Sequence, residues 1–391
     1  MKGLFRQKGA QLDINILASD EAQEFITTHA GILDGGFQKV EMSDKMRERL
    51  TRSNYIFSGI KTFHELNEAF PSMLDENGNK KPFERFLNDV QKINDTYNAN
   101  YLHAEYNFVQ ASATMAAKWE QFSEDGDRYN LQYRTAKDDK VRPEHAALDG
   151  VTLPMSDSFW ETYYPPNGWN CRCTVVQVRK QKYPATEHTE AMSRGEEAMN
   201  GERYNIFRFN SGKQGKTMPD YNPYTIRRCN DCDVAKGGNT KLGFVPDYQL
   251  CQGCIMIRKC SEDRNRDNSA KATKKSPEVK KLQGTTISNP DFNHEVLVTG
   301  GSIREWTNQP HKDYAAKNSI LKHIAKVFRE ANYIGVVDNF KQKPGVIQSH
   351  LFETTVLGDV SWIVIREYDD GRFILHSLSD GDRIKTGIRK E

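Results

Sequence analysis

Four cysteines in the second half of the chain have the spacing of a metal-binding pair of knuckles. Cys229 and Cys232 form one Cys-x-x-Cys pair, and Cys251 and Cys254 form a second pair after eighteen intervening residues. Each such turn presents two sulfurs to one ion, and two turns complete the tetrahedral shell that zinc prefers. We therefore predict a structural zinc ribbon over residues 226–257, because four protein ligands leave no open position for catalysis. Two disulfides are the alternative.

A second group of soft ligands lies upstream. Cys171 and Cys173 are two positions apart, so an extended backbone turns both sulfurs to the same side, and His145 can join them from the preceding loop. Thiolates and imidazole are ligands that zinc prefers, and His103 or Asp149 would supply the fourth. The alternative is that His145 bonds a neighbouring backbone group and the cysteines are small buried hydrophobes.

These cysteines follow a Pro-Pro-Asn-Gly run that shapes a loop. Proline fixes its own φ and restricts the residue before it, and Asn-Gly tolerates positive φ. Two half-motifs frame this block: Asp138-x-x-x-Arg142-x-x-His145-x-x-x-Asp149-Gly150, and Pro165-Pro166-Asn167-Gly168-Trp169-x-Cys171-x-Cys173. In order and spacing they resemble the signature of the phage Mu protein F-like head morphogenesis family. The resemblance extends to the Phe207–Asn210 and Asn222–Tyr224 segments.

The resemblance implies an α+β domain over residues 82–225 and a minor head protein, present in low copy in the head interior. It implies portal and capsid proteins as partners, contact with packaged DNA, and synthesis in the cytoplasm of a bacterial host that carries the phage or prophage. None of these expectations comes from composition or spacing.

A third set of residues near the C-terminus fits metal-independent RNA cleavage. This chemistry needs a base, an acid and a cation beside the phosphate, and histidine can fill either proton-transfer role. We predict His350 and His376 as the pair, with further groove residues Lys317, Arg366, His311 and Ser377, of which Lys317 or Arg366 would be the phosphate partner. The alternative for His376 is a core-face histidine with one backbone bond.

The elements expected around these histidines form an α+β module over residues 286–391. A helix should start at Pro310 and run to residue 331, followed by strands at 333–338, 351–357, 361–368 and 372–378. The Asp-Gly turn at 370–371 predicts an antiparallel hairpin. The order of elements resembles the nuclease superfamily that joins barnase, EndoU, the colicin nucleases and RelE, which implies a nuclease that acts on RNA or, alternatively, on DNA.

The first half of the chain should be helical. Residues 1–81 carry short helical signals that we interpret as support. After Pro82, apolar side chains at spacings of three and four continue to Trp119, which predicts one long helix or two nearly collinear ones. Such a helix is an extended strut or, alternatively, a pair folded back into a bundle.

Residues 258–285 lose this periodicity and have the composition of a basic linker. Their surplus of lysines could contact DNA phosphates, or the segment is a solvated tether. The lysines are Lys271, Lys274, Lys275, Lys280 and Lys281.

Length and composition limit the number of domains and the classes of function that the chain can have. A chain of 391 residues suggests two or three domains, and its net charge of +2 argues against a histone-like coat of positive charge. With no run of eighteen apolar residues, we expect a soluble protein without membrane contact. The predicted fold class is α+β and multidomain. Three functions remain: a structural head protein, the same protein with a nuclease effector, and a DNA-binding assembly factor with a docking module.

Overall fold

The computed structural model describes residues 1–7, 12–77, 79–219, 222, 252–338, 342–356 and 358–389. The chain divides into two compact units, Met1–Ser261 and Glu262–Glu391. The division falls inside helix α11, Gln252–Lys275. The ribbon cysteines Cys229, Cys232 and Cys251 lie outside the described residues.

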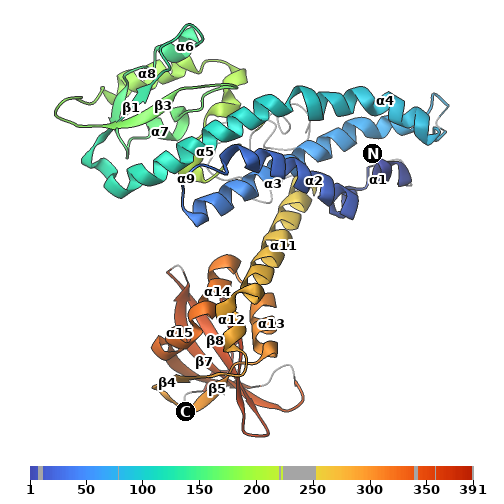
Figure 1. Cartoon of the computed structure of the whole chain (residues 1–391), viewed down its shortest axis with the longest axis vertical. Coiled ribbons are helices and arrows are strands. Elements are labelled where there is room, and N and C mark those ends of the chain that lie inside the picture. The colour runs from blue at the N-terminus through green and yellow to red at the C-terminus, as the bar shows by residue number, and fades with distance from the viewer. Residues whose placement is uncertain are drawn as a thin grey trace. The chain divides into compact units, whose positions relative to one another are not determined.

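Unit 1 begins with helices that pack on one another (Figure 1). They are α1 (Lys2–Arg6), α2 (Asp20–Asp34) and α3 (Asp44–Ala69), with α3 in contact with α2 and with the helices that follow. Ser19 and Ser43 start α2 and α3, because each side-chain oxygen accepts a hydrogen bond from a backbone N–H of the first turn. The predicted helical support is therefore present, with longer helices than the local signals indicated.

A long helical run follows Pro82, as the apolar spacing predicted. It consists of α4 (Phe83–Asp95), a π-helical turn (Thr96–Asn100) and α5 (Leu102–Asp125). Figure 1 shows them end to end, so the structure has the extended form and not the pair folded back. At 1.5 Å per residue, a run of this length reaches roughly 65 Å.

The end of α5 leads into a small α+β module that shares its core with the helices. A three-stranded antiparallel sheet has the order β2-β1-β3, with β1 at Asn130–Arg134, β2 at Thr152–Pro154 and β3 at Thr174–Val178. Short helices surround it: α6 (Pro143–Ala146), α7 (Phe159–Tyr163), α8 (His188–Ala198) and α9 (Ser211–Gln214). Buried residues of both parts belong to one hydrophobic cluster, so the predicted division at residues 81/82 does not separate two cores.

The segment predicted as a basic linker is helical. Helix α11 ends at Lys275, and α12 covers Pro277–Leu282. A helix can form without an apolar stripe when it contains good helix formers such as lysine, arginine, glutamate and alanine. The hydrophobic periodicity therefore gave no signal for this helix. Small or apolar side chains at Ala270, Thr273, Ser276 and Val279 are nonetheless buried, and the lysines between them are exposed.

Unit 2 is built on a six-stranded sheet with the order β4-β5-β9-β8-β7-β6. The strands are β4 (Thr286–Asn289), β5 (Phe292–Leu297), β6 (Asn332–Asp338), β7 (Val346–Val356), β8 (Asp359–Tyr368) and β9 (Phe373–Ser379). The four predicted strands correspond to β6–β9, and the β8–β9 hairpin is antiparallel as expected. Strands β4 and β5 were not predicted, and β5 pairs with β9 in parallel, so the sheet is mixed.

Helices cover one face of this sheet. They are α13 (Gly300–Asn308), α14 (Tyr314–Ile320) and α15 (Ile324–Glu330), with a 3-10 turn at Leu321–His323. The single helix predicted from Pro310 is thus two short ones joined by that turn. Trp306, Leu321, Ile324 and Phe328 pack on the sheet in one buried cluster.

Candidate functional site

His145, Cys171 and Cys173 converge in the α+β module of unit 1, as their spacing predicted. Nδ1 of His145 lies 3.7 Å from the sulfur of Cys171 and 3.9 Å from the sulfur of Cys173. All three ligand atoms lie within 4.8 Å of one another. His145 and Cys171 are buried, and Cys173 is partly buried.

Local structure brings these side chains together. Pro143 starts the short helix α6 that carries His145, and a turn closed by the Cys171 N–H and the Gly168 carbonyl precedes the cysteines. A Cβ at Gly168 would lie 3.1 Å from Arg142 Nη1 and 3.7 Å from His145 Cε1, so a side chain at this position would crowd the guanidinium. Cys171 and Cys173 are separated by one residue and point to the same side.

The donor set fits a zinc ion. Tetrahedral zinc with sulfur at about 2.3 Å and nitrogen at about 2.0 Å separates the two donor atoms by about 3.5 Å, close to the spacing found here. The alternative, a backbone bond from His145, is not present among the described residues, because Nδ1 faces the sulfurs and Nε2 is buried without a partner. The described residues supply three donors, and a tetrahedral shell needs one more ligand.

Neither residue suggested as a fourth ligand joins the cluster. Asp149 accepts hydrogen bonds from the backbone and side chain of Thr135 and pairs with Lys137. His103 lies exposed on α5 beside Asn107. Both suggestions were therefore wrong for this arrangement, because Asp149 is already used to fix the loop after β1.

The two thiols influence each other's ionisation. Hydrogen bonding from Cys173, reinforced by His145, holds the pKa of Cys171 well below that of an ordinary thiol. The pKa of Cys173 is raised, because it is hydrogen-bonded to Cys171 and because it is buried.

Other residues of the two half-motifs hold the loop in shape. Arg172 forms a two-pronged ion pair with Asp138, at 2.5 and 2.7 Å. Tyr133 donates to the buried Asn167 side chain at 3.0 Å, and the Trp169 ring packs edge-on against Phe108 at 5.1 Å. These contacts give a structural role to the motif residues outside the His145 cluster.

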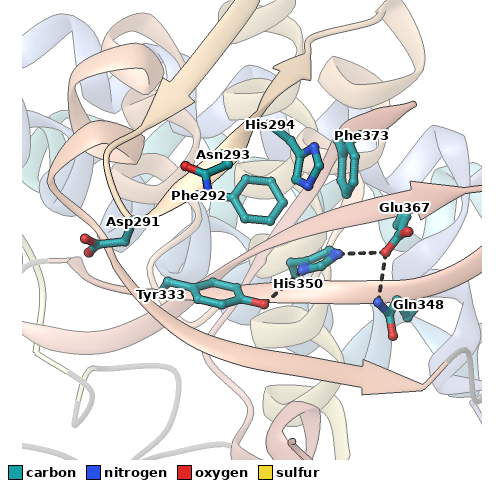
Figure 2. A pocket seen from close by; sticks show the side chains of 9 residues that line it. All are labelled: Asp291, Phe292, Asn293, His294, Tyr333, Gln348, His350, Glu367 and Phe373. Carbon is teal, nitrogen blue, oxygen red and sulfur yellow. Dashed lines mark hydrogen bonds and ion pairs between the residues drawn. The ribbon is translucent and has the colours of Figure 1, made fainter. Parts of the chain in front are cut away.

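A second candidate site is an open pocket of about 350 Å³ in unit 2 (Figure 2). It is lined by Asp291, Phe292, Asn293, His294, Tyr333, Gln348, His350, Glu367 and Phe373. His350 lies between two polar partners: Nδ1 is 3.0 Å from the Tyr333 hydroxyl, and Nε2 is 2.9 Å from Glu367. Gln348 donates to the same carboxylate at 2.9 Å.

The other predicted groove residues do not line this pocket. His376 lies on β9, at a register shift between β8 and β9, and β8 separates it from the strand of His350. Arg366 pairs with Ser349, the neighbour of His350, so the alternation of a strand places it on the opposite face. Ser377 is buried opposite Val364. The structure therefore does not assemble the predicted His350–His376 pair.

Lys317 and His311 have structural partners. The Lys317 ammonium is buried and donates to the carbonyl oxygens of Trp306 and Gln309 at the end of α13, and burial lowers its pKa to about 7. His311 lies 3.3 Å from the Ser361 hydroxyl, and burial lowers its pKa as well. Neither residue lines the pocket that contains His350.

Of the ribbon cysteines only Cys254 is described. It lies in the first turn of α11 and is buried in the core of unit 1. The predicted ribbon itself falls outside the described residues.

Sequence reasoning missed Tyr333, Glu367 and His294. Glu367 continues the alternation of Ile363 and Ile365 on β8, and a carboxylate at the end of a buried stripe was an available signal. Tyr333 was placed correctly in a strand but was not recognised as a partner of His350. His294 lies on the unpredicted strand β5.

Among the residues that the structure describes, no helix is both long and apolar enough to cross a membrane.

Comparison with known families gives two separate matches. Residues 76–176 match the family model described as Phage Mu protein F like protein. Residues 265–375 match Large polyvalent protein-associated domain 3. The second description names no nuclease, so the predicted nuclease resemblance is not confirmed. No solved structure matches the chain at a significant level.

Two relatives are similar to this chain. The chain is 29% identical over 285 residues to a capsid assembly protein F of Escherichia phage Mu, covering 66% of this chain and 61% of that protein. It is 32% identical over 102 residues to the Mu-like prophage FluMu F protein of Haemophilus influenzae, covering 26% and 22% of the two chains. The chain thus spans less than two thirds of either relative. Residues 76–176 form a Phage Mu protein F-like region.

Proposed function

We propose that this chain is a minor head protein that acts in the assembly of a phage head. The observation that carries the proposal is the 285-residue similarity to a capsid assembly protein, which extends well beyond the family match at residues 76–176. The half-motifs of that region form one packed module around His145, Cys171 and Cys173, which supports a shared structural role.

The proposal includes portal and capsid proteins as partners, a place in the head interior, and synthesis in the host cytoplasm. Contact with packaged DNA is supported by the exposed lysines of α11 and α12, which lie between buried positions on the same two helices. Contacts between lysine and phosphate would weaken steeply with salt. These lysines are Lys271, Lys274, Lys275, Lys280 and Lys281.

A stop codon placed early in the gene, within the phage or prophage that encodes it, tests the assembly role. We expect filled heads counted by electron microscopy to fall sharply, and full-length chain supplied in trans to restore them. Capsid or portal subunits should also co-purify with the tagged full-length chain. Normal yields of filled, infectious heads without the chain would overturn the proposal.

We further propose that the module binds a structural zinc ion through His145, Cys171 and Cys173. The spacing of the three donors supports this ion, and the ion would tie α6 to the segment before β3. Zinc here would add to the stability of the module, since metal bound only by the folded state contributes to folding.

Zinc content of the purified full chain separates this site from the proposed ribbon. Two equivalents are expected for the native chain, one for Cys171→Ser/Cys173→Ser, and one for Cys229→Ser/Cys232→Ser. An unchanged zinc content in the first double variant would end the proposal for His145, Cys171 and Cys173, and the second variant tests the ribbon independently.

RNA cleavage by unit 2 is a second candidate function. It is supported by His350, which lines an open pocket and has both an acid and a carboxylate within hydrogen-bond distance. The competing proposal is a docking module without catalysis. Incubating the full chain with transfer RNA in buffer free of divalent metal decides: cleavage that His350→Gln abolishes supports the enzyme, and intact RNA supports docking.

A further inference from the structure

His350 is largely enclosed by the side chains around it. The ring of Phe292 packs against it at 4.9 Å and that of Phe373 at 5.5 Å. Its two nitrogens face Tyr333 and Glu367, and the residue is only 3% exposed. A ligand in the pocket therefore meets the groups around His350 before it meets the imidazole.

The hydrogen-bond partners of His350 indicate which ring nitrogen carries the proton. Partial burial alone would raise the pKa of Glu367, but hydrogen bonds from His350 and Gln348 hold it below its ordinary value, so the carboxylate is ionised at neutral pH. A carboxylate only accepts, so Nε2 of His350 carries the proton. In a neutral imidazole Nδ1 then accepts from the Tyr333 hydroxyl, and Figure 2 marks the contact between the two groups.

Three neighbouring strands supply this chain of groups. Tyr333 lies on β6, His350 on β7 and Glu367 on β8, and the β6–β7 register shifts between Tyr333 and Gly335. Gly335 has φ of 129°, and a Cβ there would lie 2.2 Å from the carbonyl oxygen of Arg389. Such a bulge re-aims the side chains beside it, and here it accompanies the turn of Tyr333 toward His350.

We propose that Tyr333 is the reactive group of this pocket, with His350 as its proton acceptor and Glu367 as the residue that positions His350. A nucleophile or proton donor, a base within hydrogen-bond reach, and a third group that orients the base are the parts of a catalytic triad. The sequence predicted two histidines as the reacting groups. The geometry favours Tyr333 instead.

The ligand that fits is a ribose hydroxyl, which rests on the proposed cleavage of RNA. Among the described residues, no lysine or arginine lines the pocket, and Arg389 donates to the lining residue Gln348 at 3.4 Å, so a phosphate would meet a cation only beside the lining. It does offer a flat aromatic surface, since the exposed ring of His294 stacks on Phe373 at 4.1 Å and 19°. Unpaired bases stack on such surfaces. The sugar and base would occupy the pocket, and the phosphate would lie outside it.

Tyr333 relays a proton from the 2′-hydroxyl to His350 in this reaction. The 2′-hydroxyl gives its proton to the Tyr333 oxygen while the phenol proton passes to Nδ1 of His350, and the imidazolium that results faces the Glu367 carboxylate. The 2′-oxygen bonds to phosphorus, the bond from phosphorus to the 5′-oxygen breaks, and the leaving oxygen takes a proton from water. The hydroxide that remains accepts the proton back from His350 through Tyr333. The products are a 2′,3′-cyclic phosphate and a 5′-hydroxyl.

RNA cleavage by the full chain is the first measurement. Tyr333→Phe removes only the hydroxyl, and we expect it to lower the cleavage rate by about 10²- to 10⁴-fold. Tyr368→Phe, at the end of β8 and outside the pocket lining, is the matched control and should cleave at the native rate. Cleavage by Tyr333→Phe at the native rate would overturn the inference.

A second measurement does not depend on RNA, and its first part uses only the native chain. An aryl sulfonyl fluoride reacts with activated phenols: the tyrosine oxygen bonds to sulfur, fluoride leaves, and the phenol proton passes to the base. Peptide mapping of the native full chain should show Tyr333 labelled before Tyr368, and His350→Gln and Glu367→Gln should remove this preference. Labelling that ignores both substitutions would overturn the inference. Selective labelling of Tyr333 in a chain that leaves RNA intact would support the triad and reject RNA as its substrate.

Discussion

Arg142 donates a hydrogen bond from Nη2 to the carbonyl oxygen of Trp169 at 2.7 Å. The two residues belong to different half-motifs, 27 positions apart along the chain, and this bond joins them beside the His145 cluster. It gives a physical reason for the two half-motifs to occur together. A guanidinium reaches over Gly168, and the small residue leaves room for it.

Replacing this guanidinium should therefore loosen the module. We expect Arg142→Met to lower the free energy of unfolding of unit 1 by about 1–3 kcal/mol, because the partly buried Trp169 carbonyl loses a charged donor. Chemical denaturation followed by tryptophan fluorescence measures it. Arg194→Ala, which removes an exposed ion pair on α8, is the control and should stay within about 0.5 kcal/mol of the native chain. Equal effects of the two substitutions would contradict the role of Arg142.

Two glycines of unit 1 should respond to alanine in opposite directions. Gly31 lies exposed within α2 and has open space around it, so Gly31→Ala should stabilise by about 0.5–1 kcal/mol through helix propensity. At Gly212 in α9, a Cβ would lie 2.1 Å from the Cβ of Trp119, a position that cannot rotate away. Gly212→Ala should destabilise by about 1–3 kcal/mol or more. Thermal unfolding of the two variants side by side gives both signs, and a tolerated Gly212→Ala would show that α9 can shift.

The sequence predicted contacts within the upstream site better than those in unit 2. Cys171 and Cys173 share a side because they are two positions apart in extended chain, and this local rule needs no knowledge of the fold. The meeting of Tyr333, His350 and Glu367 depends on the registers of three strands and on a bulge at Gly335. Neither the register nor the bulge can be read from the pattern of apolar residues in a single strand.

Some residues were assigned wrong roles because the sequence did not predict the helices that contain or contact them. Lys317 was interpreted as a phosphate partner because its helix was expected and α13 was not. With α13 present, its last carbonyls accept from Lys317, so the ammonium has a structural task. The lysine-rich segment was likewise predicted as a tether, because its helix buries small residues such as Ala270 and Thr273 instead of a wide apolar stripe.

A buried ion pair in unit 1 should make its stability depend on pH. Lys61 contacts Glu105 at 2.6 Å and His29 Nε2 at 3.0 Å, and His29 Nδ1 faces Ser58 at 2.8 Å. Burial, together with the charge of Lys61, lowers the pKa of His29 below 6.5 despite Glu105. The unfolded chain then binds the proton more tightly than the folded chain. The contribution of His29 is therefore present above pH 6.5 and is lost as the pH falls toward the folded-state pKa.

His29→Gln tests this linkage, because glutamine keeps an acceptor for Lys61 and a donor for Ser58 but does not titrate. The stability of unit 1 should fall less between pH 7 and pH 5 in His29→Gln than in the native chain. Hydrogen exchange of the amides in α2 and α3 reports on this unit alone. Parallel pH profiles for the two proteins would show that His29 does not set the dependence.

Lys317 should have the same sign of pH dependence in a higher range. Its pKa is lowered by burial from the ordinary value to about 7, so the unfolded chain again binds more protons, and the stability of unit 2 should rise between about pH 7 and 10. A neutral amine still has two N–H groups, one for each carbonyl of Trp306 and Gln309. Lys317→Met should cost about 1–3 kcal/mol at high pH by leaving these carbonyls without a donor, and less near pH 7. Calorimetry of the full chain at pH 7 and pH 9.5, with the exposed Lys322→Met as control, measures the difference, and a cost that shrinks as the pH rises would contradict a buried neutral amine.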